Sequence, residues 1–217
     1  MPKKSALRTA PRFDRDLSDE RVLLADDADV TDAIVSGNFV DSDLTSLQIT
    51  SCRLVDARLT GSRLSRGHLT DCVVLDSDFS GVFLGECRLT RVEFHRCRLS
   101  GLQALGSNFD DVAFFDCKMA EASLRTSEWQ RAEFHDCDLV DSDFHGSKLP
   151  AARFERCDLS GADLSKSDLR GSRLHGSILD RLHGGEALRG VTIGSEQIVP
   201  ADLAVFAALN ISVGDDE

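Results

Sequence analysis

Residues 157–174 read CDLSGADLSKSDLRGSRL, a stretch that places a leucine at every fifth position, from Leu159 to Leu174. Followed in both directions, the same step runs from Ile34 to Leu179 and meets an apolar residue at all 30 positions. Because the chain is only 41% hydrophobic, chance does not explain this series. A period of five fits neither an α-helix nor a single strand, but it fits short extended segments joined by sharp bends.

A second series, of small residues, lies two positions before each apolar centre. Between Gly37 and Ser177 it has 29 members, of which 27 are Gly, Ala, Ser, Cys or Val, and the exceptions are Leu47 and Leu102. Four segments in a square coil would repeat every 20 residues, with successive coils stacked about 4.8 Å apart like strands in a sheet. Small residues would then turn into the corners, while Leu or Phe would fill the centre.

The cysteines support a coil of this length, because all seven belong to the small-residue series. Four of them step by 20 along the chain, and so do four phenylalanines of the central series. We predict two stacked ladders inside the coil: Cys97, Cys117, Cys137 and Cys157, and Phe94, Phe114, Phe134 and Phe154.

Several segments resemble the motif of the pentapeptide-repeat proteins, which is a small residue, a polar residue, Leu or Phe, and two more polar residues. Examples are CRLVD (52–56), SDFSG (77–81), CDLSG (157–161) and ADLSK (162–166). The resemblance covers about 150 of the 217 residues. It implies an all-β fold, the right-handed quadrilateral parallel β-helix. Four sides and a right-handed turn follow from the resemblance, not from the period.

A repeating rod must be capped at both ends. We expect four parts: a flexible basic arm (1–12), an N-terminal cap or imperfect first coil (13–32), the β-helix (33–182) and a C-terminal cap (183–217). The repeat fails after Leu182, at His183-Gly184-Gly185. Within the C-terminal cap, Pro200 suits the first turn of a short helix over about 200–209 and Asn210 suits its exit.

The predicted helix has one apolar side, formed by Leu203, Phe206, Ala207 and Ile211. The topoisomerase-protecting subgroup of the family is similar in this respect, which implies a homodimer formed through the C-terminal segment. The surplus of apolar residues in a short tail also favours such a contact. The alternative is a cap that folds back on its own rod.

No catalytic, cofactor or metal site is predicted. The sequence contains no CxxC pair and no GxSxG, Walker, HExxH or GxGxxG motif. His95, His135 and His175 share one outer stripe, but two coils, about 9.6 Å, separate neighbours, which is too far for one metal ion. The N-terminus lacks a secretory signal and no apolar run approaches the roughly 20 residues of a membrane span. We therefore expect a cytoplasmic, non-enzymatic protein with no membrane partner.

One outer stripe is unusually apolar for this motif, and we regard it as a candidate protein-contact stripe: Val35, Val55, Leu75 and Phe115. Exposed apolar residues in a row indicate a contact with a partner. The alternative is that N- or C-terminal residues of the same chain fold over the stripe.

Charge is uneven along the predicted rod. The net charge is −12, which disfavours direct binding to nucleic acid or anionic membranes and permits partners that are basic or that normally hold DNA. It also serves solubility alone. Residues 53–98 have eight Arg against six acidic residues, whereas residues 110–168 have seven basic residues against 14 acidic ones. The candidate acidic face comprises Asp136, Asp138, Asp141, Asp143, Asp158, Asp163 and Asp168.

These features predict a rigid, protein-binding scaffold. The alternative follows from the resemblance to the fluoroquinolone-resistance proteins that protect DNA gyrase and lack projecting loops. It is an acidic rod that mimics DNA and occupies the DNA channel of gyrase or another topoisomerase. About 7.5 coils at ~4.8 Å would give a rod of roughly 36 Å, which is the length of about ten base pairs.

Overall fold

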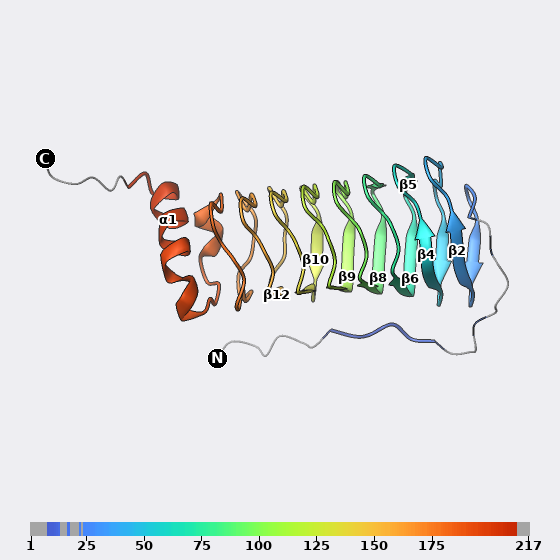
Figure 1. Ribbon diagram of the computed structural model, residues 1–217, viewed down its shortest axis with the longest axis horizontal. Helices are drawn as coiled ribbons and strands as arrows, with labels where there is room; N and C mark the ends of the chain where they lie inside the picture. Colours follow the sequence, from blue (N-terminus) through green and yellow to red (C-terminus); the bar gives the residue numbers. More distant parts are fainter. Residues whose placement is uncertain (1–7, 14–16, 18–21, 23, 212–217) are drawn as a thin grey trace, which may run out of the picture.

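The computed structural model describes residues 8–13, 17, 22 and 24–211, which form a single rod with a short helix across one end (Figure 1). The rod consists of short strands that recur as the chain winds around the axis. The strands are β1 (Asp29–Thr31), β2 (Ile34–Asn38), β3 (Gln48–Thr50), β4 (Arg53–Arg58), β5 (Arg63–Ser65), β6 (His68–Leu75), β7 (Phe83–Gly85), β8 (Arg88–His95), β9 (Asn108–Phe115), β10 (Glu128–Gln130), β11 (Glu133–His135) and β12 (Arg153–Glu155). The C-terminal elements are η1 (Gly185–Leu188), η2 (Ser195–Gln197) and α1 (Ile198–Ala208).

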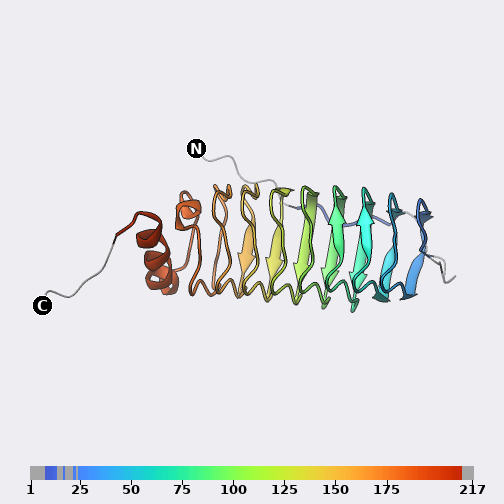
Figure 2. The same cartoon turned by 90° about the horizontal axis from the view of Figure 1, so that it is seen from above.

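Neighbouring coils pair in parallel, and each residue faces its equivalent one predicted coil further along the chain. Strand β6 pairs with β8 so that Leu69 faces Leu89, and β8 pairs with β9 so that Leu89 faces Phe109. Isolated bridges such as Arg98 to Lys118 continue the same offset on the other sides of the coil. The predicted fold class, a right-handed quadrilateral parallel β-helix with a short C-terminal helix, is confirmed. Figure 2 shows the coils stacked along the axis.

Aromatic rings of the central series fill much of the rod. Four of them stack in successive coils: Phe94, Phe114, Phe134 and Phe154. Their neighbouring centroids lie 4.9, 5.1 and 4.7 Å apart with nearly parallel planes. On an adjacent side, Trp129 stacks on Phe109 at 3.7 Å. Most of these distances match the strand spacing of about 4.8 Å, so backbone pairing and ring stacking favour the same geometry.

The seven cysteines are free and buried. Cys97, Cys117, Cys137 and Cys157 occupy equivalent positions in successive coils, and each Sγ lies 3.4 or 3.5 Å from a backbone oxygen of the preceding coil. Burial raises the pKa of the Cys72 thiol to about 12 and that of Cys87 to about 11. At neutral pH these two thiols are therefore protonated, small apolar side chains.

The corners of the coil place non-glycine residues in the left-handed backbone region, a conformation that costs about 1–2 kcal/mol per residue. Asp71 and Arg91 are examples, with φ of 54° and 52°. At several corners an arginine pairs with both carboxylate oxygens of the aspartate one coil earlier: Arg91 with Asp71, Arg96 with Asp76, and Arg156 with Asp136. These cross-coil pairs help to offset the backbone cost of the corners.

The N-terminal end departs from the period of 20. Strand β1 pairs with β3 at an offset of 19, and β2 pairs with β4 so that Val35 faces the central residue Leu54. The register changes between Val35 and Gly37 and returns to 20. Val35 is consequently buried, and its assignment to the outer stripe is wrong. The apolar series masks this slip, because Ile34 and Val35 are both apolar and either could be counted as the centre.

The C-terminal end is closed by α1, which begins at Ile198, two residues before the predicted start. Gly185 makes this closure feasible, because a Cβ there would collide with the carbonyl group of Ala204 in α1. Gln197 is buried beneath the helix. Its amide nitrogen donates to the carbonyls of Leu174 and Ser177, and its side-chain oxygen accepts the N–H of Gly194. A single side chain thus pairs three backbone groups at the end of the last coil.

Candidate protein-binding face

One side of the rod has a pattern that repeats every two coils. We call this side the strand face; its segments are 53–55, 73–75, 93–95, 113–115, 133–135 and 153–155, which belong to β4, β6, β8, β9, β11 and β12. Residues 91–95 read RVEFH and residues 131–135 read RAEFH. Glu93 and Glu133 both pair in register with Ala113, one from each neighbouring coil. Two carboxylates therefore flank a residue with almost no side chain.

Two buried carboxylates line the corner beside the strand face. Asp71 and Asp111 are only 8% and 6% exposed, and each receives a forked ion pair, from Arg91 and from Arg131 respectively. Burial alone would raise their pKa, but the arginine hydrogen bonds and a backbone N–H outweigh it and lower the pKa of both carboxyls. The two groups are therefore charged acceptors held in fixed orientations.

Along the middle of the strand face, aromatic side chains form an outer stack. His95, Phe115 and His135 are nearly parallel, with centroids 4.7 and 5.0 Å apart. His135 lies 3.4 Å from a carboxylate oxygen of Glu133 and 3.3 Å from one of Glu155. The hydrogen bond with Glu133 is the main cause that raises the pKa of His135.

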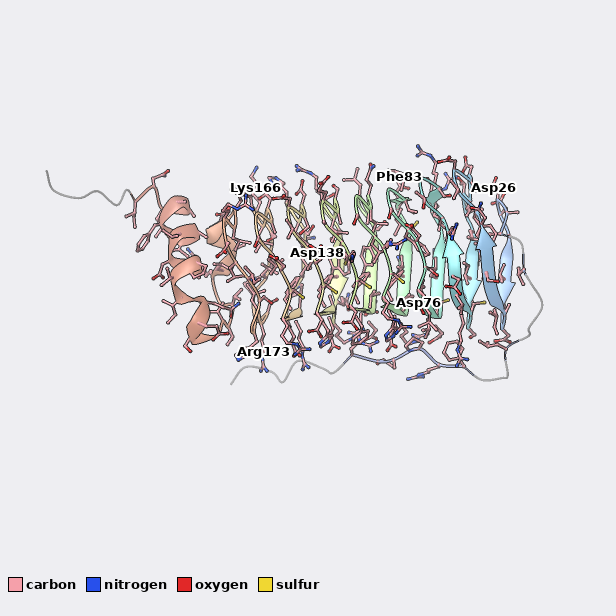
Figure 3. All side chains as sticks on the ribbon, in the orientation of Figure 1. Asp26, Asp76, Phe83, Asp138, Lys166 and Arg173 are labelled. Carbon is pink, nitrogen blue, oxygen red and sulfur yellow. The ribbon has the colours of Figure 1, made fainter. Side chains whose placement is uncertain are left out.

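The described part of the N-terminal segment lies along this face (Figure 1), where side chains fill the space between it and the rod (Figure 3). The Arg8 guanidinium contacts Glu93 at 2.6 Å and Glu133 at 3.4 Å. The N–H of Thr9 donates to Asp111 and the N–H of Arg12 donates to Asp71. Residues 8–12, which the sequence assigns to a flexible arm, thus have specific contacts here.

The members of the predicted apolar stripe have different environments. Val35 is in the core, whereas Val55, Leu75 and Phe115 are half-buried on the strand face. The contacts of the N-terminal segment fall on the neighbouring row, at Glu93 and Glu133, and on the corner carboxylates. Phe115 is sandwiched between two histidine rings, so the centre of the stripe is aromatic and titratable rather than purely apolar.

The aspartates of the predicted acidic face do not share one face, because residues five apart lie on successive sides of the coil. Asp138 pairs in register with Asp158, Asp143 with Asp163, and Lys148 with Asp168, on three different sides; Asp136 and Asp141 are corner residues.

Most of these aspartates also have local partners. Asp136 pairs with Arg156 and Asp168 with Arg170. The Oδ1 atoms of Asp138 and Asp158 accept the N–H two residues further on.

Helix α1 packs on the rod through Ala201 and Ala204, which are buried. Of the predicted apolar side, Leu203 is 64% exposed and Ile211 is 47% exposed, Ala207 is exposed and Phe206 is half-buried. Val199 is also exposed, at 71%. The helix therefore caps its own rod with one side and presents apolar side chains to solvent on the other.

An open hollow of about 760 Å³ is lined by side chains of alternating charge, among them Arg58, Asp76, Asp78, Arg96 and Arg98. Within the described ranges, no three His, Cys, Asp or Glu side chains gather as a metal ion requires. Among the helices that the structure describes, none has the length and apolar character to cross a membrane.

A family of known repeat proteins matches part of this rod. The family described as Pentapeptide repeat region matches residues 87–164 and 107–183. The chain is similar to trypsin-treated QnrB1, a plasmid-mediated fluoroquinolone resistance protein, with 19% identity over 89% of this chain and 96% of that one and a TM-score of 0.36. A pentapeptide repeat protein from the Arabidopsis thaliana thylakoid lumen has 24% identity over 44% of this chain and 66% of its own, with a TM-score of 0.41.

HetL, a protein involved in heterocyst differentiation regulation from the cyanobacterium Nostoc sp. strain PCC 7120, has 18% identity over 72% of this chain and 82% of its own, with a TM-score of 0.27. No curated protein matches the chain by sequence. Together, the five-residue repeat, the square parallel coil and the family match over residues 87–183 show that the rod is a pentapeptide-repeat β-helix.

Sequence reasoning missed the acidic site that holds Arg8. Its signal is present as a step of two coils, which relates Asp71 to Asp111 and Glu93 to Glu133. The histidines at 95 and 135 follow the same step. What the repeat could not reveal is that a segment outside it crosses two coils and brings an arginine to this site.

Proposed function

We propose that the chain acts by binding other proteins rather than by catalysis, and that it does so as a homodimer joined through α1. The observation that carries the proposal is the apolar surface on the far side of this helix. Val199, Leu203 and Phe206 are spaced for one helical stripe, and Leu209 is 63% exposed. Exposed apolar surface of this kind at the end of a rod favours pairing end to end, which would double the length of the binding surface.

A cytoplasmic location is part of this proposal. Its support is the state of the cysteines, all seven of which are free. Proteins that keep many free thiols are typical of reducing compartments, whereas extracellular proteins pair them in disulfides.

The dimer is tested by light scattering coupled to size-exclusion chromatography. We expect the wild-type chain to have twice the protomer mass of 23.7 kDa, and Leu203→Asp to have the mass of one protomer. Burying an unpaired charge in an apolar contact is strongly unfavourable, so one substitution should suffice. The matched control is Leu105→Asp, which changes another exposed leucine, on a side of the rod, and should remain dimeric. A wild-type chain that elutes as a monomer at micromolar concentration would refute the dimer.

A second candidate function is DNA mimicry, in which the acidic part of the rod occupies the DNA channel of DNA gyrase. The support is the in-register alignment of carboxylates on adjoining sides, Asp138 with Asp158 and Asp143 with Asp163. Each pair places two carboxylate-bearing residues at the coil spacing of about 4.8 Å, which gives two short stretches of negative charge along the axis. These stretches would attract the basic lining of a DNA channel without any chemical step.

The test is a gyrase supercoiling assay with and without a quinolone. We expect micromolar wild-type protein to inhibit or protect gyrase, and the Asp138→Asn, Asp158→Asn double variant to act at least about tenfold less well, since each lost ionic contact is worth about 1 kcal/mol or more. Asparagine retains the oxygen that accepts the N–H two residues on, so the coil should be preserved. Asp78→Asn is the control, because Asp78 makes the same local bond in the basic half. Absence of any effect of the wild-type protein on gyrase would remove this candidate.

A further inference from the structure

The N-terminal segment lies on the rod in the way that a bound peptide lies on a receptor. Arg8 and Phe13 mark the ends of its contacts: Arg8 reaches Glu93 and Glu133, and the Phe13 ring lies 5.3 Å from the guanidinium carbon of Arg53. Between them, Ala10 and Arg12 are exposed, and the contacts are made by backbone N–H groups. The segment runs across the coils rather than along a strand (Figure 1).

We call the site that holds Arg8 the socket; it is formed by Glu93, Ala113 and Glu133. Ala113 is fully buried at its base, and Glu93 and Glu133 belong to the coils on either side of Ala113. The Arg8 side chain in the socket is only 10% exposed. A longer side chain at position 113 would fill the space that the guanidinium occupies. Because the guanidinium is a planar fork with several N–H donors, it can reach both carboxylates at once, which a lysine ammonium cannot do as well.

The main-chain contacts match the spacing of the coils. Asp111 and Asp71 are two coils apart, which corresponds to about 9.6 Å at the strand spacing. Thr9 and Arg12, whose N–H groups they accept, are three residues apart, which spans about 10 Å in an extended chain. The match requires an extended segment but no particular side chain at these two positions.

The receptor side of this contact is formed by the rod alone. Asp71 and Asp111 are fixed by Arg91 and Arg131, which are themselves parts of the coils. If the segment leaves, the socket retains its two glutamates, and the corner retains two oriented carboxylates. A preformed site that then lacks its cation favours another guanidinium of the same geometry.

We propose that the strand face is a receptor for an extended, arginine-bearing segment of a partner protein, and that residues 8–13 occupy this receptor in cis until the partner displaces them. The proposal deepens the proposed binding function by giving the chemistry of the partner, and it rests on residues that the α1 dimer does not use. The cis segment has an effective concentration of the order of millimolar, so it masks the receptor from weak ligands and sets a threshold for the partner.

The experiment uses the full-length chain and a fluorescent peptide with the sequence of residues 7–14, LRTAPRFD, in an anisotropy titration. Arg8→Ala in the protein vacates the socket, and we expect this variant to bind the peptide at least about tenfold more tightly than wild type, the factor that about 1.4 kcal/mol gives. A peptide with Lys in place of Arg8 should bind the variant at least about tenfold more weakly than the native peptide.

Adding Glu133→Gln to the Arg8→Ala protein should abolish most of this binding, whereas adding Glu121→Gln, at an exposed corner on another side, should leave it unchanged. Circular dichroism of each variant verifies that the coil is intact. Peptide binding that does not depend on Glu133, or no binding by the intact Arg8→Ala protein at millimolar peptide, would overturn the proposal. Leu203→Asp should not change the affinity for the peptide of the chain into which it is introduced. Failure of the dimer and failure of the receptor are therefore distinguishable.

Discussion

Replacing Phe134 by alanine should lower the free energy of unfolding by about 4 kcal/mol, within the range found for phenylalanine-to-alanine changes in protein cores. The ring is fully buried between Phe114 and Phe154, at 5.1 and 4.7 Å, and also meets Phe144 edge-on. Coils above and below are tied by backbone hydrogen bonds, so they cannot collapse into the space that the ring leaves. The loss should therefore include most of the cost of a cavity.

Urea unfolding measures this effect, with Trp129 as the probe. Trp129 is the only tryptophan of the chain, and its ring centroid lies 5.7 Å from that of Phe134. The matched control is Phe134→Leu, because leucine occupies most other central positions, and it should cost no more than about 1.5 kcal/mol. A loss below about 1 kcal/mol for Phe134→Ala would show that the coils adjust to the missing ring, contrary to the cavity cost expected for a rigid core.

The second large effect is expected at the closed end of the rod, where Gln197→Ala should cost about 3 kcal/mol. The substitution leaves the carbonyl of Ser177 and the N–H of Gly194 without their partner, and it removes one of the two N–H donors to the carbonyl of Leu174. Each buried, unpaired backbone group costs about 1–3 kcal/mol, and partial access of water at the rod end reduces the sum.

Thermal and urea unfolding of Gln197→Ala should be compared with those of Glu196→Ala. Glu196 is the adjacent, exposed residue, and its removal should change stability by less than about 0.5 kcal/mol. Equal stability of the two variants would mean that Gln197 is not what closes the last coil. A selective loss would identify the cap as the weak end, from which the coils separate in turn.

The sequence was sufficient to predict the coil because the same constraint is imposed 30 times, once per side. Any one apolar residue, such as Leu64, carries little information, but a long series with a fixed step predicts extended segments of five residues joined by bends. The ladder of phenylalanines follows from the same arithmetic, as equivalent residues of successive coils must stack. The number of sides and the handedness required the family resemblance, since several polygons accept a step of five.

The wrong or missing predictions concern features that the five-residue step does not determine. At Val35, two consecutive apolar residues concealed a register shift of one. The acidic residues between 136 and 168 do not form one face, because residues five apart, such as Asp138 and Asp143, lie on different sides of the rod. The contacts of Arg8 lie 85 and 125 residues away in the chain, and no periodicity connects a segment outside the repeat to its target inside.

The single-residue register shifts at the two ends have a consequence for how such a rod can change in length. Offsets of 19 relate Asp29 to Gln48 and Arg173 to Thr192, whereas the coils between keep an offset of 20. Interior coils therefore share one backbone register, and a duplication or deletion of one whole coil there would leave the register shifts at both ends unchanged. A change of two coils would also keep a glutamate on each side of an alanine, as Glu93 and Glu133 lie on each side of Ala113. Growth of the rod in units of two coils would therefore add arginine sockets at equal distances along the axis.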